Sequence, residues 1–128
     1  MVCSGKYFKE VVLLSASPSL TLQIAQWVAK HGRYAVSLFC SPTTSGLDTA
    51  LTSANRAIVD GREASAAIEA ADRAARLLGS DRVAIYAESP CEHLQQWALG
   101  RGMGVLTGPM TEAEWDAFFD ADRRETAA

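Results

Sequence analysis

Short apolar runs alternate along the chain with longer segments of helical period. The longer segments place apolar residues three and four positions apart, which is the spacing of a helix that buries one face. The apolar runs are short, rich in β-branched residues and continuous, which is typical of strands buried on both faces of a parallel sheet. The expected strands are Val11 to Leu14, Ala35 to Phe39, Ala57 to Val59, Val83 to Tyr86 and Val105 to Leu106.

The segment after the first strand has the clearest helical pattern. We expect Ser17 to cap this helix and Pro18 to occupy its first position, because a proline there gives up no helical hydrogen bond. His31 and Gly32 place a cation and a glycine at its end. The buried stripe is expected to contain Leu20, Ile24, Trp27 and Val28.

Two later helices are preceded by a capping-box spacing. Ser89 stands three residues before Glu92, and Thr111 stands three residues before Glu114. In such a pair each side chain bonds the backbone N–H of the other residue, so both positions predict helix starts. The helices after the first are expected around residues 47–54, through residues 68–78, and in the segments that follow Ser89 and Thr111.

Strands that alternate with helices in this way predict β-α-β units around one sheet. We expect a single α/β domain over residues 1–128, with a core at about 9–120 and a polar C-terminal tail. The fold class is a three-layer, doubly wound (βα)5 parallel sheet of order 2-1-3-4-5, of the receiver or flavodoxin-like kind. Ligands of such sheets bind beyond the carboxyl ends of the strands.

Composition narrows the class of partner. The chain has 128 residues, of which 48% are hydrophobic and 21% charged, and its formal net charge is −3. This balance gives no basic stripe for nucleic acid. No apolar run approaches the ~20 residues that span a bilayer, and the opening residues lack a signal-peptide pattern, so we expect a cytoplasmic location. Cys3, Cys40 and Cys91 are too few and too scattered to predict disulfides or a metal site.

One acidic residue stands where chemistry is expected. Asp60 closes the third strand in Ala57-Ile58-Val59-Asp60-Gly61 and follows Ser15 by 45 residues. In element order and in this strand end, the chain resembles a response-regulator receiver domain over residues 11–119. The resemblance implies a role in signal transduction, and it makes Asp60 the candidate phosphoacceptor.

The other positions of the motif depart from that family. Ser15, Ala16 and Ser17 stand where receivers carry the acidic pair that holds Mg²⁺. Tyr86 replaces a small hydroxyl residue, and Gly108 replaces the lysine that precedes a proline. Phosphoryl transfer needs a metal and cations around the transferring group. We therefore expect a degenerate pseudo-receiver with no enzymatic activity, no metal and no cofactor.

Other interpretations stay open for these residues. Asp60 could remain a phosphoacceptor, or could cap the turn that follows it. Ser15 and Ser17 could line a cleft or cap the first helix, and Tyr86 could be a packed ring with its hydroxyl at the rim. The hydroxyl-rich turn at residues 15–21 is also similar to the flavin phosphate loop of flavodoxin-like proteins. Pro18 removes one N–H from such a loop.

The loss of switching chemistry moves the functional hypothesis to a surface. Receivers dock or dimerise through the fourth helix, fifth strand and fifth helix, and the resemblance implies protein partners or a homodimer there. Aromatic and arginine side chains are common binding anchors. The alternative for the aromatic set is burial as a core stripe. The candidate anchors are Trp97, Arg101, Trp115, Phe118 and Phe119.

Overall fold

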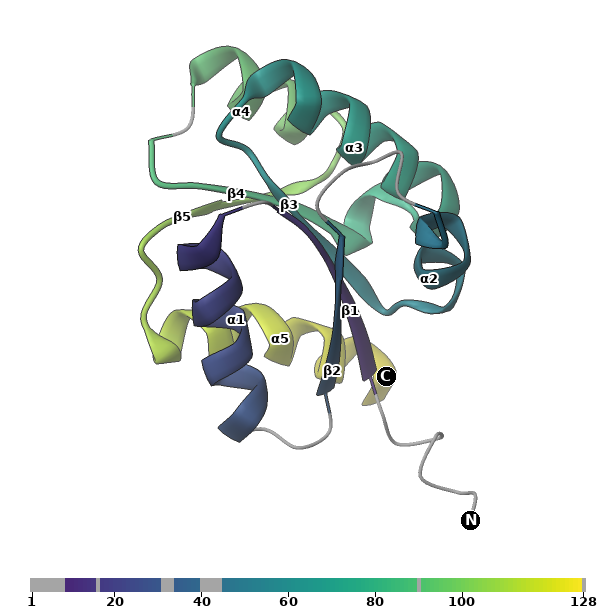
Figure 1. Ribbon diagram of the computed structural model, residues 1–128, viewed down its shortest axis with the longest axis vertical. Helices are drawn as coiled ribbons and strands as arrows, with labels where there is room; N and C mark the ends of the chain where they lie inside the picture. The colour runs from purple at the N-terminus through teal and green to yellow at the C-terminus, as the bar shows by residue number, and fades with distance from the viewer. Residues whose placement is uncertain (1–8, 16, 31–33, 40–44, 90, 128) are drawn as a thin grey trace.

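The computed structural model describes residues 9–15, 17–30, 34–39, 45–89 and 91–127, with side chains described as far as residue 119. Strands and helices alternate along the chain, as the pattern predicts (Figure 1). The strands are β1 (Lys9–Leu14), β2 (Tyr34–Phe39), β3 (Arg56–Asp60), β4 (Val83–Ala87) and β5 (Gly104–Thr107). The helices are α1 (Pro18–Lys30), α2 (Leu47–Ser53), α3 (Ala64–Leu78), α4 (Glu92–Gly100) and α5 (Glu112–Ala127), with a short 3₁₀ turn at Ser80–Arg82.

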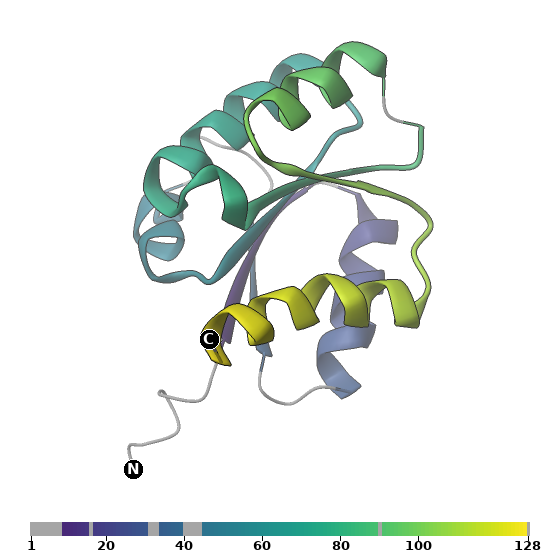
Figure 2. The same cartoon turned by 180° about the vertical axis from the view of Figure 1, so that it is seen from behind.

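The strands form one parallel sheet of order β2-β1-β3-β4-β5, which confirms the predicted topology. Helices α1 and α5 cover one face, and α2, α3 and α4 cover the other (Figures 1 and 2). The carboxyl ends of β1 and β3 lie side by side, because Leu14 pairs with Val59. The next strand continues this edge, since Asp60 pairs with Tyr86. This edge brings the candidate site residues together.

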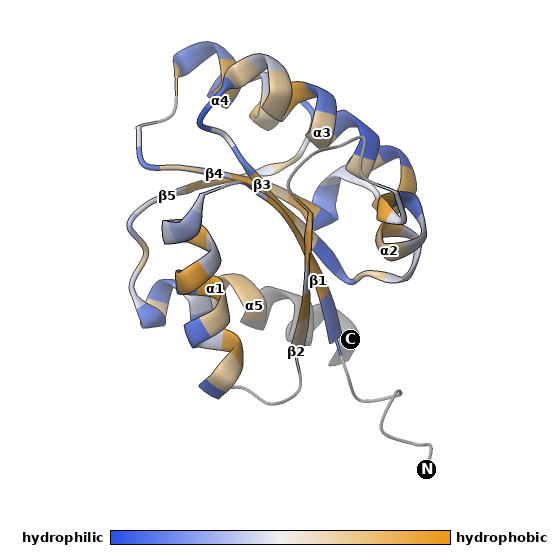
Figure 3. Cartoon of the chain, viewed as in Figure 1, coloured by the Kyte–Doolittle hydropathy of each residue, from blue (hydrophilic) through white to orange (hydrophobic). Residues whose placement is uncertain are grey.

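Each face of the sheet has its own core. The α1/α5 side buries aromatic rings together with aliphatic residues of β1 and β3. The other side packs the alanines of α3 against β3 and β4, and among the described residues its buried members include no aromatic ring. Colouring by hydropathy shows largely apolar strands between helices that carry both polar and apolar residues (Figure 3). The alanine residues buried on α3 are Ala67, Ala70, Ala71 and Ala74.

The prediction that the strands are buried on both faces is confirmed for β1, β3 and β4. It is wrong for the two edge strands, β2 and β5. Every residue of β4 is buried, as are Val11 to Leu14 of β1. In contrast, β2 contains no buried residue, and Leu38 keeps 46% of its surface exposed. In sequence β2 is as apolar as the central strands, so hydrophobicity alone does not distinguish this edge strand from them.

The helix starts agree with the sequence in two places and differ in one. Helix α1 begins at Pro18, and the Leu20 N–H donates to Ser17 Oγ over 3.5 Å. The Thr111 box is complete, because each of Thr111 and Glu114 accepts from the backbone of the other. The Ser89 box is wrong: α4 is capped by Cys91, whose Sγ accepts from Leu94 N–H over 3.4 Å.

Candidate functional site

Asp60 lies at the end of β3, and both oxygens of its carboxylate accept hydrogen bonds from neighbouring residues. The Ser15 hydroxyl donates to Oδ2 over 2.9 Å, and the Arg62 backbone N–H donates to Oδ1 over 3.1 Å. The Arg62 guanidinium adds a weaker ion pair with Oδ2 at 3.4 Å. The Asp60 side chain is 15% exposed. The bond to Arg62 N–H is the turn-capping contact that the Asp-Gly sequence predicts.

Ser15 connects this carboxylate to the start of α1. It is buried, and its Oγ also accepts from the Ser17 N–H over 2.9 Å. The hydroxyl therefore uses its proton on Asp60 and a lone pair on the backbone, while Ser17 caps the helix. Ala16, the remaining residue of this predicted site segment, lies outside the described residues.

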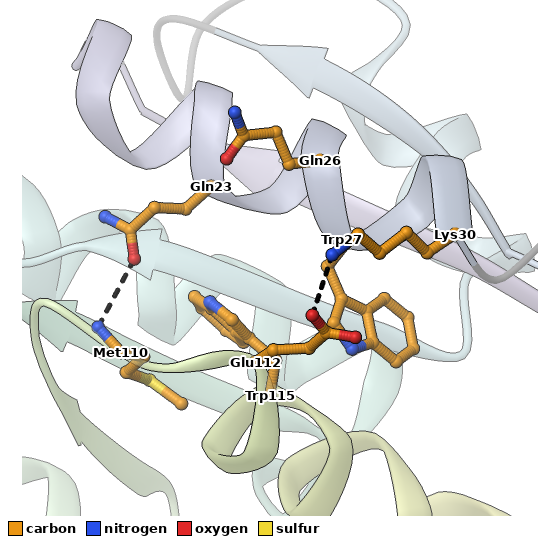
Figure 4. Close-up of a pocket in the computed structure, with 7 residues that line it drawn as sticks. All are labelled: Gln23, Gln26, Trp27, Lys30, Met110, Glu112 and Trp115. Atoms are coloured by element: carbon orange, nitrogen blue, oxygen red, sulfur yellow. Dashed lines mark hydrogen bonds and ion pairs between the residues drawn. The ribbon is translucent and has the colours of Figure 1, made fainter.

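Tyr86 is a packed ring, as one interpretation of the sequence expected, and it also lines the strand-end cleft. Only 4% of its surface is exposed, and its ring stacks on Trp115 with centroids 6.1 Å apart. Its hydroxyl accepts from Gln23 Nε2 over 3.0 Å. The other end of the same amide accepts from the Met110 N–H over 3.3 Å (Figure 4). Gln23 thus joins α1, β4 and the segment before α5.

Sequence reasoning missed Gln23 as a site residue. The available signal was its position, because Gln23 lies between Leu20 and Trp27 beside the apolar stripe of α1. A polar residue at such a position needs a hydrogen-bond partner, but the pattern does not name one. The partner is 63 residues away in the chain.

Gly108 and Tyr86 are complementary in shape. A Cβ added at Gly108 would overlap the Tyr86 hydroxyl and ring. Gly108 precedes Pro109 through a cis peptide bond, and its N–H donates to Ala87 C=O over 3.2 Å. A side chain of any size at position 108 is therefore excluded while Tyr86 keeps this place.

The strand ends enclose a cleft of about 320 Å³. Its charged groups are Asp60, Arg62 and Glu88, and Arg62 already pairs with Asp60. Within the described part of the chain, no three His, Cys, Asp or Glu side chains are grouped so as to hold a metal ion. The residues that line the cleft are Ser17, Ser19, Leu20, Asp60, Arg62, Tyr86, Ala87, Glu88 and Ser89.

A second, smaller cavity of about 110 Å³ lies between α1 and α5 (Figure 4). The Lys30 ammonium and Glu112 carboxylate pair across it at 2.7 Å, and this hydrogen bond raises the pKa of Lys30. Trp115 lines the inner wall, and its buried indole N–H has no hydrogen-bond partner within the described residues. No sequence pattern predicts this cavity, because Lys30 and Glu112 on its two walls are more than 80 residues apart.

The structure divides the predicted surface anchors and corrects two of them. Trp115 and Phe119 are each 2% exposed and belong to the aromatic core, so they cannot act as surface anchors in the folded chain. Phe118 is half-buried beneath the Arg56 guanidinium. Trp97 and Arg101 remain accessible, with Arg101 stacked 4.9 Å from the Trp97 ring.

No protein-family model and no curated protein matches the sequence. Solved structures do match. The receiver domain of an HD domain-containing protein from Pseudomonas fluorescens superposes with a TM-score of 0.78, at 13% identity, over 93% of this chain and 89% of that one. The fold is that of receiver domains.

Two further structures show how widely this fold is used. A sensor histidine kinase receiver domain from Pseudomonas aeruginosa, with magnesium in its active-site cleft, gives a TM-score of 0.68 at 18% identity, covering 89% of this chain and 96% of that one. A pilus assembly-related protein from Burkholderia pseudomallei gives 0.70 at 17% identity, over 90% and 89%. At such low sequence identities the structural similarity establishes the fold alone. The chemistry of the site has to be inferred from the residues that form it.

One negative finding bears on membranes. Within the described residues, no helix combines the length and the apolar character that crossing a bilayer requires.

Proposed function

We propose that this chain is a signalling domain that acts by contact with a protein partner and does not accept a phosphoryl group at Asp60. The proposal combines the receiver fold with a strand-end site in which the groups for phosphoryl chemistry are replaced. The observation that carries it is the Tyr86–Gly108 contact, because it fills the position where a receiver presents its lysine.

The neighbourhood of Asp60 supports the absence of a metal. Magnesium in proteins is held by oxygen ligands, usually with more than one carboxylate or with substrate phosphates. At the end of β1 the partner of Asp60 is the neutral hydroxyl of Ser15, which donates a hydrogen bond to its carboxylate. A donor at this place competes with a cation for the same oxygen, whereas a second carboxylate would attract one.

The charge around the cleft supports the same conclusion. A transferring phosphoryl group develops charge on its oxygens, and fixed cations stabilise that charge. Among the described residues that line the cleft, Arg62 is the one cation, and it is mostly exposed. Glu88 lines the same cleft and adds a negative charge. The site would thus stabilise an acyl phosphate poorly.

The direct test is mass spectrometry after incubation with acetyl phosphate and Mg²⁺. We expect no stoichiometric adduct on the wild-type chain and the same spectrum for Asp60→Asn. A stoichiometric adduct that disappears in Asp60→Asn would overturn the proposal and restore Asp60 as a phosphoacceptor.

A rebuilt site sharpens this test. The triple variant Ser15→Asp, Tyr86→Thr, Gly108→Lys supplies a second carboxylate and a lysine with room for its side chain. We expect it to form the adduct, while Ser15→Asp, Gly108→Lys with Tyr86 retained does not, because the ring still occupies the lysine position. A folded triple variant without an adduct would mean that positions other than these prevent phosphorylation.

The partner surface is proposed at the C-terminal end of α4. Trp97 is half-buried under the Arg101 guanidinium. Tryptophan and arginine are among the side chains most often found as binding anchors. Arg101 also pairs with Asp72 on α3 at 3.0 Å, which fixes its position before binding.

Retention of partners from native cell extract tests this surface. We expect Trp97→Ala and Arg101→Ala to lose a partner that the wild type retains. Leu77→Ala, an exposed leucine on α3, is the matched control and should keep it. If only Leu77→Ala lost the partner, or if all three variants retained it, the assignment of the partner surface to α4 would be wrong.

The alternatives have less support. A flavin or nucleotide phosphate would need backbone N–H groups at the start of α1, and Pro18 supplies none there. The Ser15 and Ser17 hydroxyls are also committed to hydrogen bonds within the chain. We expect the purified chain to show no flavin absorbance, and a bound flavin would contradict the lower rank given to flavin binding.

A further inference from the structure

The cavity between α1 and α5 has a buried hydrogen-bond donor in its wall. Trp115 is 2% exposed, and its indole N–H has no acceptor within the described residues. Figure 4 shows the nitrogen edge of this ring turned toward Gln23 and Met110, which also line the cavity. Buried donors in folded proteins are nearly always bonded to protein, water or a ligand. The Trp115 N–H therefore points to a molecule that supplies an acceptor.

The other polar groups nearby are already bonded. Both ends of the Gln23 amide take part in hydrogen bonds, one with a hydroxyl and one with a backbone N–H. The second indole of the cavity has an acceptor too, since Trp27 Nε1 donates to Asp116 Oδ1 over 2.7 Å. Of the two indoles, Trp115 is the one that still needs an acceptor.

The charges around the cavity favour an uncharged ligand. Lys30 and Glu112 pair across it at 2.7 Å and neutralise each other. The pKa of Lys30 is raised first by its bond to Glu112 and also by the Asp116 carboxylate, a second negative charge nearby. One ammonium and two carboxylates repel an anion. A cation would not suit the site either, because it cannot accept the indole hydrogen bond.

The walls and the size define the rest of the ligand. Trp27, Trp115 and Met110 contribute apolar surface. The Trp115 ring stacks against Tyr86 and Phe119, with centroids 6.1 Å apart in each pair, so it offers the cavity its electropositive edge. The volume is about 110 Å³. A cavity of roughly 150 Å³ takes benzene, so this one has room for about four to six non-hydrogen atoms.

We propose that this cavity binds a small uncharged molecule with a short apolar body and one carbonyl or hydroxyl oxygen. The oxygen accepts a hydrogen bond from the Trp115 N–H, and the apolar body lies against Trp27 and Met110. Because the indole nitrogen is itself buried, the Met110 side chain moves aside for the ligand to reach it. Methionine has three rotatable bonds and adapts to such a change without a change of fold.

The experiment is titration of the isotope-labelled full chain with butanone, followed through the indole N–H signals of its three tryptophans by NMR. We expect the Trp115 signal to shift and to saturate with a dissociation constant of about 1–10 mM, as suits a ligand of this size. Trp97 lies on α4, on the opposite face of the sheet, and its signal should stay in place. Propionate has the same number of non-hydrogen atoms and a negative charge, and it should bind at least about tenfold more weakly.

Two phenylalanine variants form a matched pair for the donor. Trp115→Phe removes the indole N–H, and we expect butanone to bind about tenfold more weakly, which is the loss of one hydrogen bond. Trp27→Phe alters the other aromatic wall and keeps the Trp115 N–H, so the affinity should change less than about threefold. The titration of the wild type needs neither variant to fold.

A Trp115 signal that does not respond to butanone, as expected if water alone meets the N–H, would overturn the proposal. Equal shifts with propionate would contradict the preference for an uncharged ligand. A Trp97 shift as large as that of Trp115 would mean that butanone contacts the whole surface. Unchanged affinity in a folded Trp115→Phe protein would show that the indole N–H is not the donor.

Discussion

The two helical layers solve the same packing problem with different side chains. Between α1, α5 and the sheet, Trp27 stacks on Phe119 at 4.2 Å and Trp115 stacks on Phe119 at 6.1 Å. On the other face, α3 presents alanines, which let the helix lie close to β3 and β4. A cluster of rings depends on a few large contacts, whereas an alanine layer depends on the absence of bulk.

The difference bears on function because Tyr86 belongs to the aromatic layer. Its ring stacks on Trp115, and its hydroxyl meets Gln23 and lies against Gly108. Core packing thus holds Tyr86, the residue that occupies the place of the receiver lysine. The layer of alanines carries no such link, since its buried residues do not line the cleft.

Removing a ring should have the largest effect. We expect Trp115→Ala to lower the free energy of unfolding by about 3–5 kcal/mol, because a fully buried aromatic side chain leaves a cavity. Urea denaturation measures the loss. Trp97→Ala, which removes a half-buried tryptophan from the other layer, should cost clearly less, and equal losses would contradict the contrast between buried and accessible rings.

Adding bulk to the alanine layer should be the next largest effect. Ala71→Leu places a branched side chain where Ala71 has no exposed surface, and we expect a loss of about 1–3 kcal/mol from overpacking. Ala66→Leu, on the exposed side of α3, is the control and should change stability little. A stable Ala71→Leu protein would show unfilled space in this layer.

A double-mutant cycle tests the link between the aromatic layer and the site. We expect Gly108→Ala to cost about 1–2 kcal/mol in the wild type, since its Cβ overlaps Tyr86. In a Tyr86→Ala background the same change should cost almost nothing, which gives a coupling energy of about 1 kcal/mol or more. If the losses in the free energy of unfolding were additive, Gly108 and Tyr86 would not be energetically coupled.

The smallest effect concerns the surface of the alanine layer. The hydrogen-bonded Arg73 guanidinium lowers the pKa of the Asp48 carboxyl below its ordinary 3.8. A depressed folded pKa stabilises the protein above the ordinary value, and the stabilisation is lost as the pH falls through the folded pKa.

Asp48→Asn should therefore lower the urea midpoint slightly at about pH 7, and this difference should narrow as the pH falls below about 3.8. Because the pair is exposed, about 1 M salt should also reduce the difference at neutral pH. A difference that grows on acidification would assign the effect to another group.

Sequence patterns were enough to predict the order of elements, the sheet topology, the Ser17 cap, the Thr111 box and the position of Asp60. These features depend on residues close together in the chain, where periodicity and capping chemistry act. The alternation of strand and helix then favours a parallel sheet whose strands are joined by right-handed crossovers. The turn-capping contact of Asp60 is likewise local, because its partner is Arg62.

Which distant side chains meet depends on how the chain folds. Gln23 and Tyr86 are 63 residues apart, and the contact of Gly108 with the Tyr86 ring joins two different strand ends. Helical spacing placed Trp115 and Phe119 on one face of α5 but could not say whether core or solvent covered that face. The same holds for β2, whose apolar sequence resembles a central strand, because edge and centre differ only in the neighbours that folding provides.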